Sequence, residues 1–150
     1  MGRTLRGLLI AGSFLPGLDI SSASGQVPDG IMQNPWSGYP GYTSVQVQDF
    51  NRAKEQAVIT KLSYDFTRLG LEGVSAYALF VHGWNRVNPS TKAGVPNENE
   101  FDTDIQWRPK WSFLNGFSAR FRYARVNQYQ GPKDHQDDFR LIINYDFPLL

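Results

Sequence analysis

Few residue types in this chain could carry out chemistry. The sequence has no cysteine, which excludes a disulfide, a thiol nucleophile and a Cys-ligated zinc site. Its two histidines, His82 and His135, lie far apart, and neither has carboxylates at a spacing typical of a metal site or a catalytic triad. Phosphate-binding loops, nucleophile elbows and zinc-protease helices are missing from the sequence. We therefore expect no catalytic residue, no metal, no cofactor and no enzyme.

Charged residues are numerous but balanced in sign. The 150 residues include 15 Lys and Arg against 14 Asp and Glu, which gives a net charge of +1. Binding to nucleic acid needs a clustered basic surface, and this balance does not provide one. We therefore expect no nucleic-acid partner.

The charged residues alternate with apolar ones along several segments. Between residues 100 and 108 the even positions are polar or charged, while the odd positions hold Phe101, Thr103, Ile105 and Trp107. A period of two is typical of a β-strand with one apolar and one polar face. The same alternation predicts strands at residues 57–66, 117–123 and 138–147, with further strands at the mostly apolar residues 74–84 and at residues 42–50.

The connections between these predicted strands alternate in length. Residues 68–73 and 109–116 form short connections, whereas residues 85–99 and 127–137 form long, polar ones. Short turns on one side and longer loops on the other are typical of a transmembrane β-barrel. We expect an all-β fold, an antiparallel up-and-down meander of about six strands that forms a partial wall of such a barrel.

Aromatic residues distinguish this barrel wall from a soluble alternative. They make up 14% of the chain although its mean hydropathy is below zero, and many lie near the ends of the predicted strands. Rings at both membrane interfaces account for this combination. The alternative is a small secreted β-sandwich that binds a ligand or a partner, with the rings filling its core.

The N-terminal residues have the character of a secretory signal. Two arginines within the first six residues precede an apolar stretch that ends at Leu18, and Ala23-Ser24-Gly25 fits a cleavage site before Gln26. Asp19 favours an irregular leader without a sorting role instead. We expect a signal-like or irregular leader at residues 1–25, a loop at the Pro- and Gly-rich residues 26–41, and the barrel segment at residues 42–150.

Several blocks of the sequence resemble the C-terminal part of OprD-type outer-membrane porins. In order they are GYPGYTS at 38–44, DFNRA at 49–53, LSYDF at 62–66, LEGVSAY at 71–77, and FRLIINYDFPLL at 139–150, which is similar to the family's last strand. The resemblance covers residues 34–150, and the order and spacing of the blocks carry it.

This resemblance implies a bacterial outer-membrane barrel of about eighteen strands, through which small charged solutes such as basic amino acids, peptides or carboxylates diffuse. In the family a ladder of basic side chains on the inner wall guides the carboxylate of the solute. A guanidinium suits this task because it is always charged and can bind a carboxylate through two hydrogen bonds. The matching inward-facing positions of this chain are Arg108, Arg120, Arg122, Arg140 and Lys61. Alternatively, wall carboxylates such as Asp102 or Asp104 neutralise each arginine, which then only braces the barrel.

The predicted strand number is about a third of what the resemblance implies, and a single-chain barrel needs at least about eight strands to close. We therefore expect a truncated fragment that cannot form a pore alone and from which an upstream porin segment is missing. A homo-oligomer in which several copies pool their strands is the other possibility. Its remaining partners are predicted to be outer-membrane lipid and small charged solutes.

Overall fold

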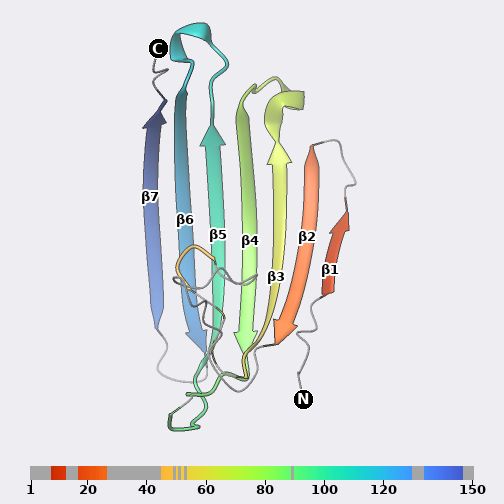
Figure 1. Cartoon of the computed structure of the whole chain (residues 1–150), viewed down its shortest axis with the longest axis vertical. Helices are drawn as coiled ribbons and strands as arrows, with labels where there is room; N and C mark the ends of the chain where they lie inside the picture. The colour runs from red at the N-terminus through yellow and green to blue at the C-terminus, as the bar shows by residue number, and fades with distance from the viewer. Residues whose placement is uncertain are drawn as a thin grey trace.

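The structure is a computed structural model that describes residues 8–12, 17–26, 45–48, 50, 52, 54–88, 90–129 and 134–146. Within these residues the chain forms one seven-stranded sheet in which the strands lie in sequence order (Figure 1). All neighbouring strands are antiparallel, so the predicted up-and-down meander is confirmed. The strands are β1 (Leu8–Gly12), β2 (Leu18–Gln26), β3 (Gln56–Asp65), β4 (Val74–Trp84), β5 (Asn97–Trp107), β6 (Phe117–Tyr129) and β7 (His135–Tyr145).

The alternation of polar and apolar residues gives the sheet two unlike faces. On β5 the side chains of Glu98, Glu100, Asp102 and Asp104 are buried, whereas Ile105 on the other face is 51% exposed. The apolar residues that face away from these carboxylates are exposed on β3 to β7, among them Leu62, Phe80, Phe101, Ile105, Phe121, Phe139, Leu141 and Ile143. A face of this kind suits lipid. We call it the outer face and the opposite one the inner face.

The β-sandwich alternative is wrong. A sandwich needs two sheets whose apolar faces pack against each other. The described residues form a single sheet, and its apolar face is left uncovered. Among these residues, no helix is long and apolar enough to cross a membrane.

The connections that follow β3 and β5 lie at one end of the sheet, which we call the short-connection end, and the connection between β4 and β5 lies at the other, the long-connection end (Figure 1). The connection between β6 and β7 is also at the long-connection end, although only residues 130–134 separate these strands. The short connections contain 3-10 turns, η1 (Phe66–Leu69) between β3 and β4 and η2 (Ser112–Leu114) between β5 and β6. Gly73 ends the first of them with φ +76°, and a Cβ there would collide with the backbone carbonyl of Arg108. Its own carbonyl accepts a hydrogen bond of 2.8 Å from the Arg108 N–H, which fastens the two short turns together.

The strand predicted at residues 42–50 is wrong for the residues that the structure describes. Residues 45–48 form a turn closed by a 3.1 Å hydrogen bond from the Val45 N–H to the Gln48 carbonyl, and Phe50 is not in a strand. Tyr42 and its two successors lie outside the described residues. The N–H groups of this segment bind side-chain carboxylates instead of a neighbouring strand, as described below. The predicted long connection at 127–137 is also shorter, because β6 extends to Tyr129 and β7 begins at His135.

The N-terminal region also differs from the expected leader. Residues 8–12 and 18–26 are the strands β1 and β2, so this part is not irregular. Strand β2 pairs with β3 over its whole length, from Leu18 opposite Tyr64 to Gln26 opposite Gln56. Strand β2 is therefore part of the wall, because its backbone pairs with that of β3 along its whole length. Residues 1–7 and 27–41 lie outside the described residues, and cleavage of a signal before Gln26 stays a prediction.

The two-faced sheet leads to a stability prediction. Ile105→Arg on the outer face should lower the free energy of unfolding in lipid vesicles by about 2 kcal/mol, because an arginine there must leave water. Ser118→Arg on the inner face should cost little, because its charge stays hydrated. Urea unfolding followed by tryptophan fluorescence measures both values, and equal losses would contradict the assignment of the faces. A spin label at position 105 should meet lipid-soluble oxygen and one at 118 a water-soluble quencher.

Candidate functional site

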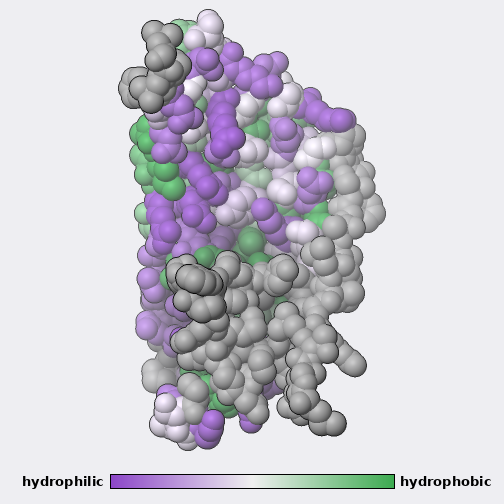
Figure 2. Space-filling model, in the orientation of Figure 1, coloured by the Kyte–Doolittle hydropathy of each residue, from purple (hydrophilic) through white to green (hydrophobic). Residues whose placement is uncertain are grey.

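The inner face carries most of the charged residues of the wall. Figure 2 views this face and shows hydrophilic residues spread across its upper, uncovered part. Asp102, Asp104, Arg120, Arg122 and Arg140 all point to this side, because residues two apart along a strand share a face and paired residues of neighbouring strands point the same way. Cross-strand register brings the charges of neighbouring strands together, and Asp104 lies directly opposite both Tyr77 and Arg122.

Four carboxylates follow one another on β5 and form a buried column, made of Glu98, Glu100, Asp102 and Asp104. None of them is more than 4% exposed. Successive members lie about 7 Å apart along the strand. Like charges this close in a low-dielectric setting need compensating donors or cations. The partners differ from one end of the column to the other.

At the long-connection end the column is neutralised by an arginine. The guanidinium of Arg86 lies 3.2 Å from Glu98 and 3.9 Å from Glu55, and it also donates to the carbonyl of Pro96. Arg86 is itself only 2% exposed. Burial raises the pKa of the Glu55 carboxyl to about 7, while a hydrogen bond from the Arg52 N–H and the charge of Arg86 act in the opposite direction.

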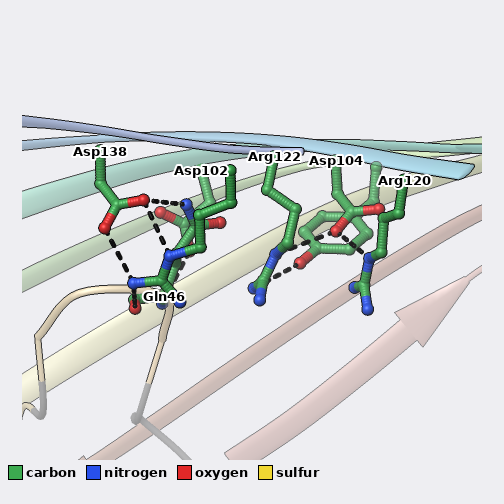
Figure 3. A network of polar contacts seen from close by, with 8 residues as sticks. Gln46, Asp102, Asp104, Arg120, Arg122 and Asp138 are labelled. Atoms are coloured by element: carbon green, nitrogen blue, oxygen red, sulfur yellow. Dashed lines mark hydrogen bonds and ion pairs between the residues drawn. The ribbon is translucent and has the colours of Figure 1, made fainter. Parts of the chain in front are cut away.

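In the middle of the column the partners are backbone N–H groups. Residues 45–48, 50, 52 and 54–55 lie on the inner face, and we call them the inner segment. Glu100 accepts hydrogen bonds from the N–H groups of Val47 (2.7 Å) and Gln48 (2.8 Å), and Asp102 accepts one from Gln46 (3.1 Å). Figure 3 shows Gln46 between Asp102 and Asp138.

At the short-connection end the partners are two arginines. The Nε of Arg120 lies 2.6 Å from Asp104 Oδ2, and the Nε of Arg122 lies 3.1 Å from the same oxygen (Figure 3). Arg122 also donates to the Tyr77 hydroxyl at 3.5 Å. The Nζ of Lys61 lies 4.3 Å from the centre of the Tyr77 ring, within the range of a cation–π interaction.

Three of the predicted basic residues therefore gather at one place. Lys61 and Arg120 line a concavity of about 440 Å³ with Tyr77 and Asp104, and Arg122 borders it. We call Lys61, Arg120 and Arg122 the basic strip. Arg120 and Arg122 share the carboxylate of Asp104, Lys61 lies over the Tyr77 ring, and Asp19 and Asp65 also line the concavity.

The other two predicted residues lie elsewhere. Arg140 is on the inner face, but it is paired with Asp138 at 2.8 Å and donates to the backbone carbonyl of Gln46. Arg108 lies past the end of β5 and is exposed in a short turn. It is therefore not on the strand, where the alternation of residues 100–108 had placed it. Asp102 and Asp104 were the two carboxylates predicted to neutralise the arginines. Asp104 pairs with Arg120 and Arg122, whereas Asp102 accepts a hydrogen bond from the inner segment.

The inner segment is the feature that the sequence reasoning missed. Phe50 packs with Ala57 and Val81 in a small core, against which Val45, Ile59 and Leu79 are also packed. Ile59, Leu79 and Val81 occupy inward positions of β3 and β4, where a bare pore wall would carry polar residues. Apolar residues at inward positions were the available signal that something covers this part of the face.

Within the described part of the chain, no group of three or more His, Cys, Asp or Glu could hold a metal ion. The chemistry of the inner face is therefore that of charges and hydrogen bonds. It can attract, orient or exclude a charged solute.

Comparisons with known proteins agree with this architecture. The family model for outer membrane porins of the OprD family matches residues 32–149. Among solved structures from Pseudomonas aeruginosa, OccK5 (OpdH) is 26% identical with a TM-score of 0.77, and OpdO is 25% identical with a TM-score of 0.79. Each covers 93% of this chain, but the chain covers only 38% and 37% of theirs. Comparison with curated protein sequences gives no match.

The family match confirms the predicted resemblance and the predicted place in the bacterial outer membrane. Proteins of this family are channels rather than enzymes, in agreement with the absence of catalytic motifs from the sequence. The aligned solved structures share the meander of antiparallel strands with this chain. With a match that extends over residues 32–149, this chain belongs to the OprD family of outer membrane porins.

Proposed function

We propose that the chain forms part of the wall of a porin that admits small solutes bearing a carboxylate, and that the basic strip lies along their path. The arrangement around Asp104 carries the proposal, because this one carboxylate contacts two guanidinium groups, those of Arg120 and Arg122, and Lys61 lies beside them over the Tyr77 ring. A fixed positive charge in a confined space raises the local concentration of anions.

The alternative role of the arginines, bracing the wall, fits Arg140 better than the basic strip. Arg140 makes two hydrogen bonds of 2.8 Å to Asp138, so its charge is balanced by one dedicated partner. Arg120 and Arg122 instead share one carboxylate, that of Asp104, although their side chains are 34% and 20% exposed and that of Arg140 is 43% exposed. We therefore narrow the proposed path from the five predicted residues to the three of the basic strip.

Passage of a solute needs a closed barrel, and the described sheet is open. Strands β1 and β7 each have one neighbour among the described residues. In lipid the free N–H and C=O groups of such edges have no water to bind, and each unpaired group costs several kcal/mol. We propose that further strands close the barrel between β7 and β1.

The number of strands favours a separate porin segment over identical copies as the source of these strands. Because the strands of the described residues alternate in direction and are odd in number, β1 and β7 run the same way, as their arrowheads show in Figure 1. Joining β7 of one copy to β1 of the next would give a parallel pair. Bacterial outer-membrane barrels are antiparallel with an even number of strands. An odd number of further strands between β7 and β1 would make every pair antiparallel and the total number of strands even.

The proposed path can be tested in a chimaera in which this chain replaces the matching part of OccK5 (OpdH). Arg120→Ala or Arg122→Ala should slow the entry of carboxylate-bearing solutes into liposomes several-fold more than the entry of neutral solutes of equal size, because the local anion concentration falls. Vanillate, with which one structure of Pseudomonas aeruginosa OpdK was determined, is a suitable test anion.

Arg125→Ala is the matched control for these two variants. Arg125 lies on β6 as well, but on the outer face, where its guanidinium is 3.9 Å from Asp137. Its loss should leave the ratio of anionic to neutral entry unchanged. Equal slowing of both kinds of solute in the Arg120 and Arg122 variants would show that these residues brace the wall.

The proposed route of closure predicts a monomer. Cross-linking of the purified chain in detergent should give a single band at the mass of one copy, because a ring of copies would need parallel junctions. The same reaction on a known trimeric porin serves as the positive control. A ladder that ends at a defined oligomer would favour pooling of strands between copies instead.

A further inference from the structure

The inner segment and the acidic column determine each other's position. Three consecutive backbone N–H groups, those of residues 46, 47 and 48, point at two neighbouring carboxylates of β5. The oxygens of a carboxyl group accept hydrogen bonds from backbone N–H groups. Three such hydrogen bonds, over a separation of more than 50 residues in sequence, fasten the segment to the wall.

A second, independent contact lies one strand away. Phe50 is 1% exposed and packs on Ala57 and Val81. Gly83 leaves room for it, since a Cβ there would lie 2.5 Å from the Phe50 ring and 2.6 Å from the Glu55 carboxylate. The segment is therefore seated by an apolar contact on β3 and β4 and by hydrogen bonds on β5.

The position of the inner segment also determines which charged side chains face the open side of the sheet. Glu100 is 0% exposed and Asp102 1%, although both stand at inward positions. The guanidinium of Arg120, nearer the short-connection end, remains one-third exposed. With the segment in place, the inner face is masked at the acidic part of the column and open at the basic strip.

We propose that Glu100 and Asp102 determine the charge selectivity of the porin through a latch: they bind the N–H groups of residues 46–48, and the segment in turn keeps both carboxylates out of the solute path. The inference deepens the proposed function, because it explains how a wall with four buried acids on one strand can still attract anions. Releasing the latch would uncover these acids and make the path attractive to cations.

The latch can be tested in the OccK5 (OpdH) chimaera folded in detergent micelles, without any measurement of transport. Glu100→Gln removes one of two accepting oxygens and turns an NH₂ group toward an N–H donor. Amide hydrogen exchange, resolved by residue with mass spectrometry, should become about tenfold faster at Val47 and Gln48. Asp102→Asn, which removes one hydrogen bond only, should accelerate Gln46 most.

Asp104→Asn is the matched control, because Asp104 is an acid of the same column whose partners in the described part of the chain are Arg120 and Arg122. It should leave exchange at residues 46–48 unchanged. Retained heat-modifiable migration on gels would show that each variant is folded. Unchanged exchange in both the Glu100 and the Asp102 variants would overturn the latch.

A second variant releases the segment while both carboxylates stay in place. Gly83→Val puts a side chain where Phe50 and Glu55 now lie. Labelling with a carbodiimide and glycine ethyl ester should then reach Glu100 and Asp102 about tenfold faster than in the unchanged chain. Gly94→Val is the control, since a Cβ at Gly94 meets nothing within 4 Å. Equal labelling in both variants would contradict masking by the segment.

The selectivity itself is measured in the OccK5 (OpdH) chimaera by the reversal potential in a salt gradient. Gly83→Val should lower the anion-to-cation permeability ratio several-fold. A chimaera without anion preference before any substitution would overturn the proposed function and leave the latch intact. A released segment with an unchanged permeability ratio would overturn the role of the latch in selectivity.

Discussion

Four carboxylates follow one another on the inner face of β5, and all are almost fully buried. Water does not stabilise their charges there, so each needs a partner from the protein. The partners are of three kinds: Arg86 for Glu98, the backbone of residues 46–48 for Glu100 and Asp102, and two arginines for Asp104. The position of the inner segment and that of the basic strip both follow from this single column.

The column divides the inner face along the strand direction. Near the long connections, acids and apolar residues lie under the inner segment, and Phe50 fills the space that Gly83 leaves. Nearer the short connections, Arg120 and Arg122 share Asp104, and Lys61 lies over the Tyr77 ring. The segment is thus part of the electrostatics of the wall, because it covers Glu100 and Asp102 and leaves Arg120 and Arg122 partly exposed.

The outer face follows from a different constraint, the absence of water in the lipid. Exposed residues such as Leu141 and Phe139, which would be a liability on a soluble protein, are the expected surface toward acyl chains. The same constraint makes the open edges β1 and β7 unstable in lipid until other strands pair with them. The matching relatives, of which this chain spans less than two-fifths, are long enough to supply such strands.

The sequence by itself determined the strands and their two faces, which depend only on the local alternation of polar and apolar residues. The period of two predicted strands and faces correctly at residues 100–107, 117–123 and 138–145, because neighbours along a strand alternate whatever lies beside them. The ordered blocks also predicted the family, which the match over residues 32–149 confirms. The basic residues on β3, β6 and β7 were correctly placed on the inner face, although their role in a solute path is still a proposal.

Tertiary structure alone decided the contacts between segments far apart in the chain. Residues 45–48 have the composition of a strand, but carboxylates more than 50 residues away bind their N–H groups and hold them on the inner face. Residues 1–25 resemble a signal, and only the pairing of β2 with β3 and of β1 with β2 makes residues 18–26 and 8–12 strands of the sheet. Register likewise set Asp104 opposite Arg122, so that two arginines share one acid. Local periodicity fixes which face a side chain points to, whereas its partner depends on which strand or segment packs beside it.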